Sequence, residues 1–288
     1  MAEWTIRALM EWTEKHFQEK GIESPRLETQ LLLSHALNCK KPDLYTRWDE
    51  VVVEESRGKF RDLIRRRLEG CPIQYVIGYR EFFLLEFEVT PAVLIPRLET
   101  ETLVAEAVKR LKSLSAARVL DIGTGSGCIA VTIAHRHKSA EVTAADISAE
   151  ALEVARRNAA RHGVAERIRF LHGDLFAPLR ADERYDVIVS NPPYVSQPDW
   201  EQLPLHVRAH EPRLALEGGP DGFAVLDRLI REAAGRLVPG GHLLLEIGAG
   251  QEAGIRQRLD SQSNLIVGPI LRDPNGLPRV ATATREGK

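Results

Sequence analysis

The sequence predicts an α/β protein with a small helical domain at its N-terminus. Apolar residues recur at helical spacing over the first 70 residues. From about residue 98, apolar strand-like runs alternate with helical patterns, which is typical of a mostly parallel sheet covered by helices on both faces. Between these regions, residues 80–90 alternate with a period of two, as in a half-buried strand. We therefore expect a helical-bundle domain over residues 1–80, a β-hairpin linker over 81–97 and the sheet domain over 98–288.

Three amphipathic helices are expected in the first domain. The first is predicted by residues spaced three and four apart: Ile6, Leu9, Met10, Thr13 and Phe17. A second begins where Ser24 offers an N-cap and Pro25 stands at the first helical position. The third places Phe60, Leu63 and Ile64 on one face and ends at Gly70.

Seven strands are expected in the sheet domain. They begin near Arg118, Glu141, Arg167, Asp186, Gly241, Asn264 and Pro278. Helical patterns separate the first six, so most neighbours should be parallel. Only a short turn at residues 273–276 precedes the seventh, which predicts an antiparallel pair at the end of the chain.

Composition limits the class of protein. The 288 residues are 43% hydrophobic and 28% charged with a net charge of −2, which favours a globular protein over a disordered one and argues against a general nucleic-acid coat. No apolar run approaches 18 residues, and the acidic N-terminus is unlike a secretory signal. Three cysteines predict neither a disulfide framework nor a zinc site. His135 and His137 are two apart, on different helix faces, so no metal is expected. We expect a soluble, cytoplasmic monomer.

A glycine-rich loop is the strongest local signal. The apolar strand that begins near Arg118 leads into Asp121, Gly123, Thr124, Gly125, Ser126 and Gly127, and a helix follows. Glycine tolerates positive φ and lets a ligand lie against bare backbone, and such a loop at the carboxyl end of a strand is where open α/β sheets bind ligands. The glycines match neither the dinucleotide pattern G-x-G-x-x-G nor a phosphate-binding P-loop.

Two further acids extend this candidate site. Asp146 ends the second strand, where a carboxylate can accept both hydroxyls of a ribose, and Asp121 could hold a ligand ammonium directly or through water. A ribose partner and an ammonium partner without a phosphate cradle favour S-adenosyl-L-methionine over NAD; the alternative is that both acids only cap helices. Asp174, after the third strand, could hydrogen-bond an adenine amino group, and Leu175 or Phe176 could pack on the ring; either could instead be core or turn.

The tetrapeptide Asn191-Pro192-Pro193-Tyr194 follows the fourth strand. The two prolines remove N–H donors and stiffen the loop, which leaves carbonyl groups free to accept. With the Asn191 side-chain carbonyl and the flat face of Tyr194, these acceptors could grip a planar NH₂ group. The alternative is a rigid turn, because Asn-Pro and Pro-Pro favour turns.

Together, the D-x-G-x-G-x-G loop, the acid that ends the second strand and the N-P-P-Y tetrapeptide resemble the class I S-adenosylmethionine-dependent methyltransferases, with a Rossmann-like sheet, that modify planar nitrogens. Over nearly the whole chain the sequence is similar to the release factor glutamine methyltransferases, the HemK/PrmC family. The segments at residues 72–82, 94–101, 211–216 and 239–248 carry this further resemblance.

This resemblance implies methylation of the glutamine N5 amide nitrogen in the Gly-Gly-Gln loop of class I peptide-chain release factors, with S-adenosyl-L-homocysteine as product. Asn191, Pro192 and Tyr194 would be catalytic, and with Pro193 they would bind the substrate. Asp121, Asp174, Leu175 and Asn191 would contact the cofactor along with Asp146 and the glycine loop. Residues 1–80 would dock the protein substrate. Two alternatives remain: a DNA adenine or ribosomal RNA amino methyltransferase with the same core, for which the only dense basic run is Arg65–Arg67, and a non-enzymatic scaffold.

Overall fold

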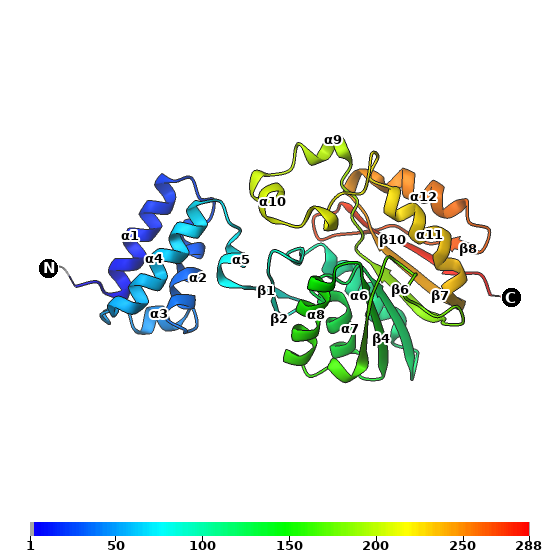
Figure 1. The fold of residues 1–288 in the computed structure, drawn as a ribbon, viewed down its shortest axis with the longest axis horizontal. Coiled ribbons are helices and arrows are strands. Elements are labelled where there is room, and N and C mark those ends of the chain that lie inside the picture. The colour runs from blue at the N-terminus through cyan, green and yellow to red at the C-terminus, as the bar shows by residue number, and fades with distance from the viewer. Residues whose placement is uncertain (1–2, 288) are drawn as a thin grey trace. The chain divides into compact units, whose positions relative to one another are not determined.

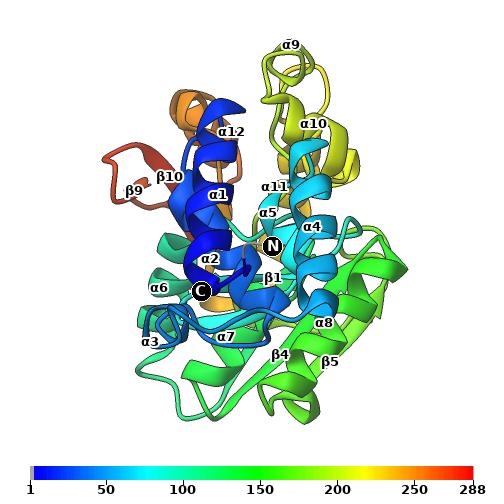
Figure 2. The same cartoon turned by 90° about the vertical axis from the view of Figure 1, so that its left-hand side faces the viewer.

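The computed structural model describes residues 3–287 and divides the chain into two compact units, Met1–Gly78 and Tyr79–Lys288 (Figure 1). The first unit is helical, with α1 (Ile6–Glu19), α2 (Pro25–Ala36), α3 (Asp43–Thr46), α4 (Glu54–Leu68) and α5 (Ile73–Ile77). Within it, α2 packs on both α1 and α4 (Figure 2). All five apolar or small residues expected on the inner face of α1 are buried, as the periodicity predicted.

The second helix begins as predicted, although its cap differs from the expected one. Ser24 occupies the N-cap position and Pro25 the first helical turn, but the Ser24 side chain makes no capping hydrogen bond. In α1, by contrast, the backbone nitrogen of Ala8 donates to the Thr5 hydroxyl at 3.2 Å. After α4, Gly70 has a φ of +92°, a left-handed conformation that favours glycine after a helix.

The period-two stretch at residues 80–90, predicted as one strand of a hairpin, forms both strands of a tight hairpin instead. β1 (Tyr79–Phe82) pairs antiparallel with β2 (Leu85–Glu88), and the turn residues Phe83 and Leu84 both have positive φ, +51° and +64°. Phe83 and Leu84 are not the residues that usually signal such a turn. Contacts beyond the hairpin hold it instead: Glu101 accepts from the Phe83 nitrogen at 2.8 Å, and Arg136 donates to the Phe83 carbonyl at 3.0 Å.

The predicted α/β sheet is present in the second unit. Its path is β5-β4-β3-β6-β7-β10-β8, with β3 (Ala117–Ile122), β4 (Ala140–Asp146), β5 (Ile168–His172), β6 (Tyr185–Ser190), β7 (Leu237–Glu246), β8 (Leu265–Val267) and β10 (Pro278–Arg285). β3 to β7 are parallel where they pair, and β10 lies antiparallel between β7 and β8, as predicted for the last pair. An additional short strand, β9 (Leu271–Arg272), pairs with β10. β7 begins four residues earlier than predicted.

Alternating side chains of the strands build a separate core on each face of the sheet. Val119 and the residues aligned with it pack with α6 (Thr100–Leu111), α7 (Cys128–Arg136) and α8 (Ala149–Arg161). The neighbouring Leu120 belongs to the opposite core, with α11 (Ala224–Arg236) and α12 (Glu252–Asp260). This two-sided burial explains why the strands are almost continuously apolar.

The chain between β6 and α11 carries two short helices, α9 (Gln197–Trp200) and α10 (Leu205–His210), and single 3₁₀ turns lie at Ala165–Arg167, Arg213–Ala215 and Ala249–Gln251. Within residues 3–287, every helix is too short or too polar to cross a bilayer.

Candidate active site

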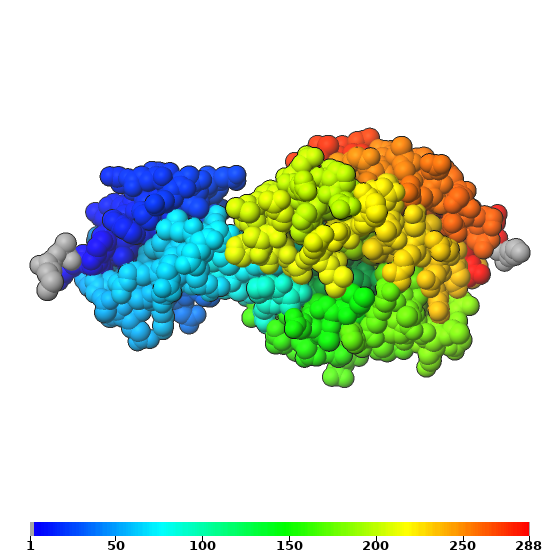
Figure 3. Space-filling model, turned by 45° about the horizontal axis from the view of Figure 1, so that its top comes forward, coloured from blue at the N-terminus to red at the C-terminus, as the bar shows by residue number. Residues whose placement is uncertain are grey.

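A cavity of about 260 Å³ lies at the carboxyl ends of the parallel strands in the second unit. In the space-filling view, the yellow segment before α11 and the green segments that follow β4 and β5 meet at this cavity (Figure 3). Of the residues predicted to bind cofactor or substrate, nine line it: Gly123, Thr124, Gly125, Ser126, Asp146, Asp174, Leu175, Asn191 and Pro193. The structure thus brings together residues that are up to 70 positions apart in the sequence.

Glycine is required at the three positions of the loop for different structural reasons. Gly123, Gly125 and Gly127 all have positive φ, between +56° and +78°. A Cβ atom added at Gly123 or Gly125 would have no neighbour within 4 Å, so these two leave open space beside the cavity. A Cβ atom at Gly127 would lie 3.0 Å from the Cβ of Ala155, so this glycine permits close packing of the loop on α8.

Asp121 holds the glycine-rich loop by hydrogen bonds but does not line the cavity. Its Oδ2 accepts from the Thr124 hydroxyl at 2.7 Å and from the Ala130 nitrogen at 3.1 Å, whereas the buried Oδ1 has no hydrogen-bond partner. Burial raises the pKa of Asp121 to about 7, against the lowering effect of these hydrogen bonds. The buried hydroxyl of Ser126 also lacks a partner. Because buried polar groups are normally satisfied, these two atoms indicate a ligand or water at the loop.

Asp146 lies at the end of β4 with its carboxylate beside the cavity. Its Oδ2 accepts from the Gly125 nitrogen and its Oδ1 from the Ser148 nitrogen, both at 2.8 Å. Burial raises the pKa of Asp146, and the backbone donors oppose this effect. Each carboxylate oxygen can accept more than one hydrogen bond, so both retain capacity for a ribose hydroxyl.

In the segment after β5, the two residues considered for the adenine ring lie in different environments. Phe176 is buried in the core beneath α11, whereas Leu175 lines the cavity and has a φ of +48°. A leucine in the left-handed region is strained, and such strain is typical of functional sites. Asp174 is half-exposed and forms an ion pair of 2.6 Å with Arg228, which also lines the cavity.

The tetrapeptide follows β6 and is fixed from two sides. Asn191 lines the cavity, and its Nδ2 donates to the hydroxyl of Thr100 at 3.2 Å. The Tyr194 hydroxyl donates to Oε1 of the buried Glu246 at 3.3 Å. Burial also raises the pKa of the Tyr194 phenol, which therefore stays protonated. Pro192 and Tyr194 do not line the cavity themselves.

Two hydrogen bonds from one side chain fix the backbone at the end of the tetrapeptide, and the sequence did not predict them. The Gln251 amide nitrogen donates to the carbonyls of Tyr194 at 3.2 Å and Gly222 at 3.1 Å. Gly222 has a φ of +80°, and a Cβ atom there would lie 2.4 Å from the Tyr194 carbonyl oxygen. The glycine is therefore required by a close backbone approach that only the folded structure reveals.

A second ion pair, also missed from sequence, joins two segments of the cavity wall. Glu211 is buried and accepts from the Ile95 nitrogen at 3.2 Å and from Arg97 at 2.6 Å. Arg97 lines the cavity, so this carboxylate holds a positive charge at its rim. Both residues lie in the segments that carried the family resemblance, which was the only signal available from sequence.

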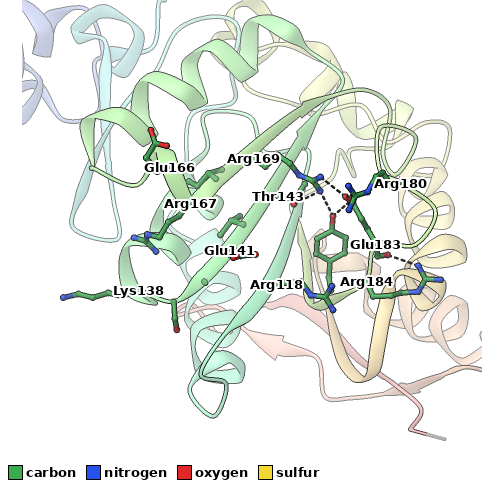
Figure 4. A pocket seen from close by; sticks show the side chains of 15 residues that line it. Arg118, Lys138, Glu141, Thr143, Glu166, Arg167, Arg169, Arg180, Glu183 and Arg184 are labelled. Atoms are coloured by element: carbon green, nitrogen blue, oxygen red, sulfur yellow. Dashed lines mark hydrogen bonds and ion pairs between the residues drawn. The ribbon is translucent and has the colours of Figure 1, made fainter.

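A second hollow, of about 610 Å³, lies at the amino ends of the same strands (Figure 4). It contains none of the predicted site residues. Its lining is strongly charged, with the basic residues Arg118, Lys138, Arg167, Arg169, Arg180 and Arg184. Glu183 accepts from Arg169 at 2.7 Å and also pairs with Arg180, so much of this charge is compensated.

The histidines and cysteines are spread over both units of the fold, with two histidines on one short helix. His206 and His210 are four residues apart on α10, a spacing that the sequence analysis overlooked. Across residues 3–287, no group of three or more histidine, cysteine, aspartate or glutamate side chains is placed to hold a metal ion. The cysteines are free, and burial raises the pKa of the Cys128 thiol to about 12, as for a core residue.

Comparison with known proteins agrees with this arrangement. A PrmC N-terminal domain model matches residues 8–78, and a methyltransferase small domain model matches residues 100–206. A release factor glutamine methyltransferase from Rhodopirellula baltica is 46% identical, over 90% of this chain and 89% of its own length. The chain belongs to the release factor glutamine methyltransferase family. Another family member, from Geobacter sulfurreducens, is 44% identical over 96% of this chain and 95% of its own length.

Solved methyltransferase structures share the fold of this family member. A methyltransferase from Pyrococcus furiosus superposes with a TM-score of 0.51 at 22% identity, over 81% of this chain and all of that one. The hMettl16 catalytic domain gives a TM-score of 0.54 at 16% identity, over 79% of this chain and 82% of that one. At these identities the likeness concerns the fold alone.

Proposed function

We propose that this protein methylates the side-chain amide nitrogen, N5, of the glutamine in the Gly-Gly-Gln loop of class I peptide-chain release factors, with S-adenosyl-L-methionine as methyl donor. The observation that best supports this proposal is that Asn191 and Pro193 line the same cavity as the glycine loop. An acceptor site for a planar NH₂ group therefore lies beside a candidate cofactor site. The names of relatives that match about 90% of the chain or more support the same substrate.

The residues present fit the proposed cofactor. Asp146 would accept its ribose hydroxyls. The unpartnered Oδ1 of Asp121, which is buried and does not line the cavity, would reach its ammonium group through water. Asp174 and Leu175 would contact its adenine, while Gly123 and Gly125 leave room for it beside the backbone. When bound, S-adenosyl-L-methionine supplies a methyl group on a positively charged sulfur, and S-adenosyl-L-homocysteine is the product.

The main task of the tetrapeptide is alignment, because an amide nitrogen is a poor nucleophile. Its lone pair is shared with the carbonyl group, and holding the nitrogen in line with the methyl carbon could contribute up to ~7–11 kcal/mol. We assign acceptance of the two N–H groups to the Asn191 side-chain carbonyl and the Pro192 backbone carbonyl, and packing against the amide plane to Tyr194. These acceptors stabilise positive charge as it develops on nitrogen. The bound cofactor would supply the methyl group, and the glutamine nitrogen held by Asn191 and Pro192 would release its proton after accepting that group.

A competition assay tests the activity. Intact release factor, DNA and ribosomal RNA are each offered with methyl-labelled S-adenosyl-L-methionine. We expect label in the release factor alone. Label in nucleic acid with none in the release factor would overturn the proposal and favour the amino methyltransferase alternative.

We further propose that residues 1–80 dock the body of the release factor. The PrmC N-terminal domain model covers this region, and Trp12 is half-exposed on α1, where it stacks on His16. We expect Trp12→Ala to raise the KM for intact release factor several-fold while the Kd for S-adenosyl-L-methionine stays unchanged. Ile266→Ala, an equally exposed apolar side chain on β8, is the matched control. Equal KM values for the two variants would argue against docking through this face of α1.

A further inference from the structure

A buried carboxylate lies behind the tetrapeptide, and the mechanism proposed above does not use it. Glu246 ends β7, beside β6, and is 1% exposed. The Tyr194 hydroxyl donates to its Oε1 at 3.3 Å, and the Thr100 hydroxyl interacts with the carboxyl and helps to lower its pKa. Its Oε2 is buried without a close partner. Burying a carboxyl group in this way is costly, which calls for a reason beyond stability.

The charged side chains around Glu246 do not fully neutralise its negative charge. Arg279 faces it from β10, but this guanidinium pairs with the buried Asp273 at 3.3 Å. Glu99, before α6, is a like charge, and Cys128 on α7 is a neutral thiol. Within residues 3–287, no lysine or arginine forms an ion pair with Glu246. The carboxyl therefore interacts with the hydroxyls of Thr100 and Tyr194 and, without forming an ion pair, with the charge of Arg279.

The hydroxyl of Thr100 connects this carboxylate to Asn191. Thr100 is 1% exposed in the first turn of α6, and its Oγ1 accepts from the Asn191 Nδ2 at 3.2 Å. A hydroxyl has one hydrogen and two lone pairs, whereas an ionised carboxylate only accepts. Burial raises the pKa of Glu246 to about 7, so the next step applies to its ionised form. If the Thr100 hydrogen points to Glu246, only a lone pair remains to face Asn191. That lone pair selects the NH₂ end of the Asn191 amide and leaves the carbonyl end toward the cavity.

We propose that Thr100 and Glu246 are positioning residues that fix which end of the Asn191 amide faces the substrate and hold the Tyr194 ring by its hydroxyl. With Asn191 in this orientation the site presents an acceptor to the substrate NH₂ group. The flipped amide would present its own NH₂ group and repel the substrate. This inference rests on the proposed function, because it concerns the same glutamine amide.

Variants of Thr100 test the inference. Thr100→Val keeps the shape of the side chain but removes the hydroxyl that accepts from Asn191 and faces Glu246, and Thr100→Ser restores this hydroxyl. In single-turnover methylation of release factor at saturating concentrations, we expect Thr100→Val to lower the rate constant about 10- to 100-fold, as a small misalignment of the reacting atoms would. Thr100→Ser should stay within about threefold of wild type. The Kd for S-adenosyl-L-methionine should change less than about threefold in both, because neither of these interactions reaches the glycine loop.

Glu246→Gln gives a second test if Thr100→Val folds poorly. Its amide can donate to Thr100, which would release Asn191 from a single orientation, so the rate constant should again fall while the Kd for S-adenosyl-L-methionine holds. A wild-type rate constant in Thr100→Val or Glu246→Gln, or an equal loss in Thr100→Ser and Thr100→Val, would overturn the inference. An inactive wild-type protein on release factor would instead overturn the proposed function, so the two failures are distinguishable.

Discussion

Buried carboxyl groups have opposite pKa shifts at the two ends of the parallel strands, which we call the carboxyl edge and the amino edge of the sheet. At the carboxyl edge, burial raises the pKa of Asp121 to about 7, and one of its oxygens has no partner. At the amino edge, the hydrogen bond from Arg169 lowers the pKa of Glu183, whose charge is compensated. The amino-edge hollow is the larger of the two, yet the smaller cavity is the one lined by the unpartnered Ser126 hydroxyl and by the strained backbone of Leu175. Unsatisfied polar groups and strained backbone therefore indicate the site better than the volume of a cavity does.

The largest effect should come from changing the acceptor at the carboxyl edge. Asn191→Asp keeps the size of the side chain but removes the NH₂ group that donates to Thr100 and adds a negative charge. We expect the single-turnover rate constant on release factor to fall roughly 100-fold or more, about 2.7 kcal/mol in barrier. The new carboxylate would stabilise the positive sulfur in the ground state, which lowers the rate without weakening binding, so the Kd for S-adenosyl-L-methionine should change much less. A near-wild-type rate would reduce the tetrapeptide to a structural turn.

A smaller effect, on binding rather than rate, is expected at the end of β4. Asp146→Ala removes the carboxylate assigned to the ribose hydroxyls, at a cost of ~1.5–3 kcal/mol. Calorimetric titration should show the Kd for S-adenosyl-L-methionine raised roughly 10- to 150-fold. The melting temperature serves as the control for folding. An unchanged Kd would remove Asp146 from the cofactor site and weaken the contrast between the two edges.

The raised pKa of Asp121 predicts how stability depends on pH. A carboxyl whose pKa is higher in the folded than in the unfolded protein stabilises the fold at low pH, and this contribution is lost as pH rises through about 7. Between pH 6 and 8 the cofactor-free protein should lose about 1.4 kcal/mol through this group, or roughly 3–6 °C in melting temperature. Asp121→Asn should reduce that pH dependence. An equal pH dependence in the variant would show that Asp121 does not titrate in this range.

The smallest effect is expected at the amino edge. Arg118→Ala removes a charge from the lining of the larger hollow without touching the carboxyl ends of the strands. We expect the Kd for S-adenosyl-L-methionine and the rate constant on release factor both to stay within about twofold of wild type. A loss comparable with that of Asp146→Ala would show that the amino edge contributes to the site, contrary to the comparison above.

The sequence predicted elements whose signals are local and missed those that depend on distant contacts. The inner face of α1, the strand–loop–helix at Gly123–Gly127 and the position of Asp146 after β4 follow from periodicity and turn chemistry. The turn at Phe83-Leu84 has no local signal, because side chains of Glu101 and Arg136 hold it.

The same reason explains the missed parts of the site. Thr100 and Glu246 are 146 positions apart. They meet Asn191 and Tyr194 because β6 and β7 are neighbours in the sheet and α6 packs on both strands. Gly222 would read as an ordinary turn glycine without the folded position of the Tyr194 carbonyl. Sequence spacing therefore predicted the residues that face the ligand, but not the residues behind them.

The most direct test of the account is the position of the methyl group in a release factor after reaction. Wild-type protein and Asn191→Asp are each incubated with release factor and S-adenosyl-L-methionine, and the digested product is mapped by tandem mass spectrometry. The account predicts a single methyl group on the side-chain nitrogen of the Gly-Gly-Gln glutamine with the wild type, formed far more slowly by the variant. A methyl group on another residue, or equal rates for the two proteins, would contradict it.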